Sequence, residues 1–153
     1  MPVIRNPTPL PDPTPSPATG PSAQVSLSKI GDLTQFGAHL QVLPPGSRTS
    51  ILHWHAAEDE LIYVLAGTPT LTEGETETLL NPGDCATFKA GVAVGHSFAN
   101  HNAEPVRLLV VGTRAQQDRV TYPLIDVILT RDRAKGTHGW TNAAGVPVGD
   151  PYA

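Results

Sequence analysis

The sequence predicts an all-β domain, either a sandwich or a small barrel. From about residue 26 onward, short apolar runs are interrupted by turn signals about every 8–12 residues, a spacing typical of antiparallel strands. The runs are rich in Val, Ile, Thr and Leu, and most alternate apolar with polar residues. The composition agrees, because 16 prolines and 14 glycines in 153 residues leave little room for long helices.

Nine runs predict the strands in chain order. They are FGAHLQVL from Phe36, TSILHWH from Thr49, LIYVLAG from Leu61, TPTLTE from Thr68, TETLLN from Thr76, CATFK from Cys85, GHSFAN from Gly95, VRLLVVG from Val106 and LIDVILT from Leu124. Turn-forming Gly, Pro, Asn and Asp residues separate most of them. After Thr113 the pattern loosens, and only the last run predicts a strand there.

Composition divides the chain into three segments. Residues 1–25 are predicted to form a Pro-rich extended arm, since eight of the 16 prolines lie within the first 21 residues and remove backbone donors. We expect this arm to be mobile or to lie on the surface, or else to bind a neighbouring subunit or a proline-reading domain. Residues 26–130 would form one barrel. Residues 131–153 form a Gly-rich tail that is too polar for its own core, so it would lie against the barrel, cross to another subunit or stay mobile.

Charge and composition exclude several kinds of partner. The net charge is −4 and the ten Lys and Arg residues are scattered, so no basic stripe for nucleic acid is present. The apolar runs are far shorter than the roughly 20 residues that span a bilayer, and the N-terminal sequence shows no export signal. The single cysteine excludes an internal disulfide and fits a reducing compartment. We expect a cytoplasmic protein with neither nucleic acid nor membrane as a partner.

The segment SILHWHAAEDE carries the chemistry that the sequence reveals. Side chains alternate along a strand, so His53 and His55 share one face. A turn at residues 56–59 would return the chain and place Glu60 opposite both histidines in an antiparallel pair. Two imidazoles and one carboxylate suit iron, manganese, zinc, nickel or cobalt, and the absence of Lys and Arg between residues 48 and 89 favours a cation. The alternative is a pair of surface histidines on an edge strand.

With these residues the sequence resembles the cupin superfamily, in particular small single-domain bacterial cupins of unassigned function. The residues that carry the first motif are Gly46, His53, His55, Glu60 and Gly67. The second motif is PGDCATFKAGVAVGHSFAN, with Gly83, Gly91, His96 and Asn100. The resemblance implies a double-stranded β-helix, or jelly roll, and a homodimer. It also implies a 3-His-1-Glu set around one divalent ion (Fe, Mn, Zn or Ni), formed by His53, His55, Glu60 and His96.

The second motif departs from the family pattern in two places. Four residues rather than two separate Gly91 from His96, and Lys89 stands where the family usually has proline. The spacing from His96 to Asn100 is retained, and for that reason we expect His96 to be the fourth ligand.

Four protein ligands on a six-coordinate ion leave two adjacent positions open. We therefore expect a metal-dependent enzyme that acts on a small polar organic molecule by dioxygenation, decarboxylation or isomerisation. Glu60 would be both a ligand and a base that can detach. The alternative is a non-catalytic cupin that binds a metal and a small ligand, as a sensor or storage module. A second inward polar cluster would favour the enzyme, and His39, Gln41 and Arg48 are its only candidates.

The other polar residues have simpler interpretations. His39 has the opposite strand parity to Ala38, Leu40 and Val42. We expect it to face the surface, and the alternative is that it lines the mouth of the barrel. We expect Lys89 to be exposed and Cys85 to be a packed small hydrophobe rather than a nucleophile. Glu58 could replace Glu60 as a ligand, but it lies in the turn. A solvated hairpin face would be formed by Glu73, Glu75 and Glu77.

Overall fold

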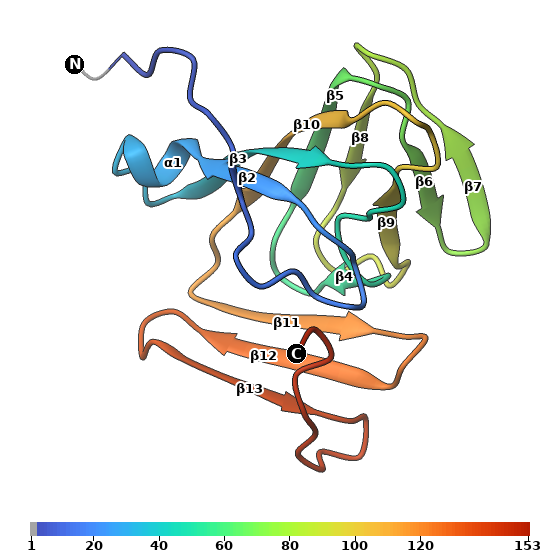
Figure 1. The fold of residues 1–153 in the computed structure, drawn as a ribbon. Coiled ribbons are helices and arrows are strands. Elements are labelled where there is room, and N and C mark those ends of the chain that lie inside the picture. The colour runs from blue at the N-terminus through green and yellow to red at the C-terminus, as the bar shows by residue number, and fades with distance from the viewer. Residues whose placement is uncertain (1–2) are drawn as a thin grey trace.

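The computed structural model describes residues 3–153, so the first two residues of the expected arm lie outside the described residues. Within this range the chain forms thirteen β-strands and one four-residue helix, α1 (Leu27–Ile30), as Figure 1 shows. The predicted all-β class is confirmed. No helix in this range is long and apolar enough to cross a membrane.

The strands form three antiparallel sheets. The largest has the spatial order β1 (Leu10–Pro11), β2 (Ala23–Ser26), β3 (Phe36–Leu43), β10 (Val106–Thr113), β5 (Glu60–Ala66) and β8 (Cys85–Phe88). The second consists of β7 (Thr76–Leu79), β6 (Thr70–Glu73) and β9 (His96–Ala99). The third consists of β13 (Thr137–Thr141), β12 (Val127–Asp132), β11 (Gln117–Tyr122) and β4 (Trp54–His55). In Figure 1 the strands of the first two sheets form the upper body, and β11, β12 and β13 lie below it.

The main core lies between the first two sheets. On β5 the predicted alternation is visible, since Ile62 and Val64 are buried while Leu61, Tyr63 and Leu65 are exposed. Eight buried apolar side chains from both sheets form one cluster: Leu43, Ile62, Val64, Leu71, Phe98, Val106, Leu108 and Val110. Their removal from water is the main force that holds the two sheets together.

A second, smaller core lies under β11, β12 and β13, which we call the C-terminal sheet. It is built from Val120, Tyr122, Val127 and Leu129, with Ile51, Trp140 and Tyr152 packed against them. The sequence predicted one strand after Thr113, and the structure has three. Residues 137–141 of the expected tail form β13, and the Tyr152 hydroxyl accepts a hydrogen bond from the Ile51 N–H at 3.2 Å. The expected tail therefore packs against this core.

The described part of the Pro-rich arm adds to the edge of the largest sheet. Leu10 and Pro11 form the edge strand β1, where the missing N–H of proline costs no hydrogen bond inside the sheet. Further along, the Thr19 carbonyl accepts a hydrogen bond from the Arg48 N–H at 2.9 Å.

The expected pairing of the two histidines with the Glu60 strand is wrong. The ordered strand β4 is only two residues long, and it pairs with β11. The neighbours of β5 are β10 and β8. His53 instead forms an isolated bridge with His96. Glu60 thus approaches the histidines from a separate sheet and not from an adjacent strand.

Candidate metal centre

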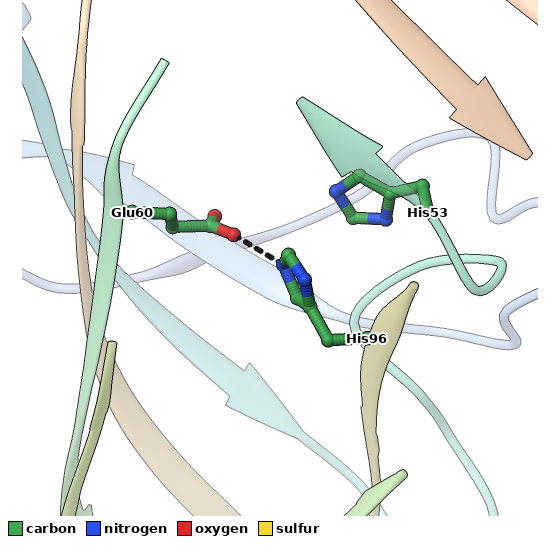
Figure 2. Close-up of side chains that lie close together, drawn as sticks. All are labelled: His53, Glu60 and His96. Carbon is green, nitrogen blue, oxygen red and sulfur yellow. Dashed lines mark hydrogen bonds and ion pairs between the residues drawn. The ribbon is translucent and has the colours of Figure 1, made fainter. Parts of the chain in front are cut away.

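Three of the predicted ligands converge at one point. His53 precedes β4, Glu60 begins β5 and His96 begins β9, so each comes from a different part of the barrel. The ligand atoms of the three side chains all lie within 4.8 Å of one another. Glu60 Oε2 is 2.7 Å from His96 Nε2, and Figure 2 shows the His53 ring facing this pair.

His53 is held in a form that can bind a metal. Its Nδ1 lies 2.9 Å from the Ile51 carbonyl oxygen, which can only accept, so Nδ1 carries the hydrogen and Nε2 keeps a free lone pair. Burial, and after it the neighbouring His96, lowers the pKa of His53 to about 4. The imidazole is therefore neutral at physiological pH.

His55 lies beside this cluster, and its ring centroid is 5.1 Å from that of His53. Its Nδ1 is 2.7 Å from Oδ2 of Asp118, whose side chain is fully buried. The second oxygen of Asp118 accepts a hydrogen bond from the Ala57 N–H at 2.9 Å. Burial lowers the pKa of His55, but Asp118 and two nearby glutamates outweigh it, and the net shift is upward. With Nδ1 engaged, only Nε2 of His55 remains for another partner.

The negative charge of Glu58 is paired with the guanidinium of Arg133. Its Oε1 accepts hydrogen bonds from Arg133 Nη2 at 2.7 Å, from Arg133 Nε at 3.2 Å and from the Ala115 N–H at 3.1 Å. Its Oε2 lies 3.9 Å from His55 Nδ1. Glu58, His55 and Asp118 form a second group of potential ligands, separate from the first. Since Glu58 and Asp118 both have partners, this group supports His55 and does not replace Glu60.

His96 is fixed by packing and by its backbone. Phe88 stacks on its ring with centroids 3.6 Å apart and planes inclined by 7°. The backbones of His96 and His53 exchange hydrogen bonds of 2.9 and 3.3 Å. This close approach requires Gly95, because a Cβ there would lie 2.9 Å from Leu52 Cγ. His96 Nδ1 is buried and has no hydrogen-bond partner among residues 3–153.

The side chains fit one divalent ion. Two ligand atoms about 2.1 Å from an ion and at right angles are about 3 Å apart, close to the separation of His96 Nε2 and Glu60 Oε2. Burial raises the pKa of Glu60, but the hydrogen bond to His96 and the surrounding histidines outweigh it, so the pKa is lowered and the carboxylate stays charged. Partners at Nδ1 also orient His53 and His55, as is usual for metal-binding histidines.

A cavity of about 230 Å³ opens beside the cluster. Besides His53, Glu60 and His96, it is lined by Gln24, His39, Gln41, Thr49, Ser50, Ile62 and Val110. The expectation that His39 faces solvent is therefore wrong. Gln41 and Leu43 are 4% and 0% exposed, which shows that the odd-numbered residues of this part of β3 point inward. Burial lowers the pKa of His39, so its ring is neutral.

A second depression lies on the other side of His96. It has a volume of about 180 Å³, and its lining includes Trp54, His55, Glu58, Glu73, Phe88, Lys89 and His96. Lys89 is exposed, as predicted, and it supplies the cation of this depression. His96 therefore lines both hollows: the inner cavity, which has no Lys or Arg in its lining, and the outer depression, which has one lysine and the two glutamates Glu58 and Glu73.

Two of the other polar candidates differ from expectation. Arg48 is exposed and does not line the inner cavity. Cys85 is exposed, so its interpretation as a packed hydrophobe is wrong, because it occupies the outward face of β8. The predicted solvated face is confirmed, since exposed positions are occupied by Glu73, Glu75 and Glu77.

Asp118 is the supporting residue that the sequence did not reveal. It lies on β11, outside both motifs, and no strand was predicted there. It shares the buried face of that strand with Val120 and Tyr122. The alternation of Asp118, Val120 and Tyr122 could have indicated a strand, but the polar residues between them weaken the apolar pattern that predicts one.

Comparison with known proteins places the chain in a family. A model described as a Cupin domain matches residues 39–112. A sugar phosphate isomerase from a cupin superfamily, from Silicibacter pomeroyi, is 36% identical, with 84% of this chain and 80% of that chain covered and a TM-score of 0.79. A candidate sugar phosphate isomerase from Acidithiobacillus ferrooxidans is 32% identical, with 85% and 81% covered and a TM-score of 0.77.

A more distant structure shares only the fold. The polyketide cyclase RemF from Streptomyces resistomycificus is 21% identical, with 74% of this chain and 79% of that chain covered and a TM-score of 0.61. No curated protein matches the chain. The predicted jelly roll agrees with these structures, whereas the homodimer stays a prediction. On the strength of its identity and coverage with the Silicibacter pomeroyi protein, this chain belongs to the cupin superfamily.

Proposed function

We propose that this protein is a metal-dependent isomerase that acts on a small phosphorylated sugar. The observation that carries the proposal is a cluster of two imidazoles and one ionised carboxylate that faces a cavity lined mostly by polar residues. Two relatives above 30% identity, one called a sugar phosphate isomerase and the other a candidate one, support the substrate class.

We assign the ion to His53, His55, Glu60 and His96, with iron, manganese, zinc or nickel as the candidates. A bound divalent ion would supply a Lewis acid that polarises the carbonyl and the adjacent hydroxyl of a sugar. The protein's own part is to hold three rings in fixed orientations through Ile51, Asp118 and Phe88. Because each ring has a fixed contact of this kind, the three imidazoles can face one point.

Glu60 is the base in this proposal. Its Oε2 faces His96, which leaves Oε1 to take a proton from the hydroxyl-bearing carbon of the substrate and return it to the neighbouring carbonyl carbon. A second proton moves from the hydroxyl to the carbonyl oxygen, so substrate and product contain the same atoms and no co-reactant is consumed. The partly enclosed cavity limits the access of water to the intermediate enediol.

Deuterium exchange tests this function. Metal-loaded protein is incubated in D₂O with a panel of aldose and ketose phosphates, and ¹H NMR follows the loss of the carbon-bound hydrogen and the formation of the isomer. We expect both with at least one sugar phosphate, and neither with Glu60→Gln. Glu75→Gln changes an exposed glutamate and is the matched control, expected to behave as wild type.

The alternative class is a non-catalytic cupin that binds a metal and a small ligand. The satisfied hydrogen bonds around His55 and Glu58 favour a rigid site, which a sensor or storage module would also use. Stoichiometric metal without exchange in any sugar phosphate would support this alternative and contradict the isomerase. Oxygen uptake with catechols or diketones would instead indicate a dioxygenase.

A further inference from the structure

One part of the lining of the inner cavity, which we call the wall, is polar but uncharged. It is formed by Gln24 from β2, His39 and Gln41 from β3, and Thr49 and Ser50 from the loop before β4. Neither Lys nor Arg is among the residues that line the cavity. Glu60 is the only acidic residue among them.

Gln41 is the most buried polar member of this wall. It is 4% exposed and lies on β3 between β2 and β10, where it is registered with Gln24 on one side and Leu108 on the other. Among residues 3–153 the buried side-chain atoms without a hydrogen-bond partner are Ser47 Oγ and His96 Nδ1, and the Gln41 amide, which lines the cavity, is not one of them. The amide offers two donor hydrogens and one acceptor oxygen to whatever occupies the cavity. A ligand with both donor and acceptor groups would satisfy them.

His39 supplies a second amphoteric group on the same wall. It lies two residues before Gln41, so both side chains point to the same face of β3. Burial lowers its pKa, and a neutral imidazole offers one donor and one acceptor. Hydroxyl groups are donors and acceptors at once, and they match both residues.

The remaining features of the cavity limit the ligand further. Ile62 and Val110 provide an apolar patch that suits the C–H surface of a carbon chain. The volume of about 230 Å³ equals about eight water molecules at about 30 Å³ each, and it is smaller than a typical drug-sized site. A phosphate dianion inside would meet Glu60 and find no Lys or Arg. Lys89 lines the outer depression, together with Glu58 and Glu73.

We propose that the His39–Gln41 wall is a binding site for an uncharged polyhydroxylated carbon chain of about monosaccharide size. The hydroxyl-bearing part of the ligand lies in the inner cavity, and any charged group stays outside it. This inference rests on the proposed function for the identity of the cavity as a substrate site, and it names the part of the substrate that enters.

Solution NMR of the Zn²⁺-loaded, ¹⁵N-labelled protein tests the site, with xylitol as the uncharged probe and inorganic phosphate as the charged one. We expect xylitol to shift the side-chain amide resonances of Gln41 saturably, and phosphate to leave them unchanged. Gln41→Leu removes the amide while keeping a similar size and should weaken xylitol binding about five- to tenfold. His39→Phe should weaken it by a similar factor and replaces Gln41→Leu if that variant does not fold. Gln116→Leu alters an exposed glutamine elsewhere and should bind xylitol as wild type does.

Three results would overturn the inference. The first is xylitol shifts that map away from β3 or do not saturate, the second is unchanged affinity in both variants, and the third is displacement of xylitol by phosphate. These results leave the isomerase proposal standing if deuterium exchange is observed. Conversely, xylitol binding at Gln41 without exchange in any sugar phosphate would retain the binding site and remove the isomerase.

Discussion

Residues 39–112 of the barrel supply the three clustered side chains, whereas the C-terminal sheet supplies the groups that hold a fourth side chain in place. His53, Glu60 and His96 lie within the part that matches the family model. Asp118 on β11 and Arg133, which follows β12, lie outside it, and they bind His55 and Glu58. The family motifs therefore identify the candidate ligands. The orientation of His55, however, depends on Asp118, which lies in a sheet that the motifs do not include.

Replacing a clustered ligand should have the largest effect. We expect His53→Gln to weaken metal binding by more than about 100-fold, because an imidazole that is already neutral and oriented is lost. Isothermal titration with Co²⁺ or Mn²⁺ measures the affinity. Removing the metal from wild type should lower its Tm by about 5–10 °C when the ion was present at 100 times its Kd. His101→Gln changes an exposed histidine and should leave both values unchanged. Equal affinity of His53→Gln and wild type would contradict the proposed centre.

Replacing the carboxylate of the C-terminal sheet should have a smaller but clear effect. Asp118→Asn keeps the shape of the side chain but removes the charge that orients His55 through Nδ1, so we expect metal affinity to fall about 10- to 100-fold. The control is Asp132→Asn, which lies in the same sheet and contacts Gln117 and Lys135 rather than a histidine. If both variants bind the metal equally well, the C-terminal sheet does not support the centre.

Breaking the ion pair between Glu58 and Arg133 should affect stability more than metal binding. Arg133→Gln leaves the largely buried Glu58 without its cation, and we expect a loss of about 1–3 kcal/mol in the free energy of unfolding. The loss is below that of a fully buried pair because the Arg133 side chain is 31% exposed. Urea denaturation measures it, and Arg5→Gln in the arm is the control. A metal affinity that falls as far as in Asp118→Asn would show that this pair also orients His55.

The smallest effect is expected on the outer side of His96. Lys89 is exposed, so Lys89→Ala should raise the KM for a phosphorylated substrate by about three- to fivefold and leave kcat unchanged. Steady-state kinetics at two salt concentrations would show the difference shrinking as salt screens the charge. Lys135→Ala, in the turn between β12 and β13, should have no effect. A large decrease in kcat for Lys89→Ala would instead place this lysine at the reacting atoms.

The sequence by itself determined the all-β class and the strand that carries Glu60. The run FGAHLQVL is the strand Phe36–Leu43 in the structure, because alternation and flanking turn residues are local signals. The same local signals separated Ile62 and Val64 from their exposed neighbours on β5. The motif residues His53, Glu60 and His96 could also be named from the sequence, since the family resemblance depends on short spacings.

Tertiary structure alone decided which strands pair and which face of a strand is inside. Alternation shows that His39 and Gln41 share a face, but only the packing of β3 against the rest of the barrel turns that face inward. The pairing of β4 with β11 joins segments more than 60 residues apart, and it brings Asp118 to His55. Local propensity carries no information on such contacts, because their free energy comes from the burial and hydrogen bonds of residues that are distant in sequence.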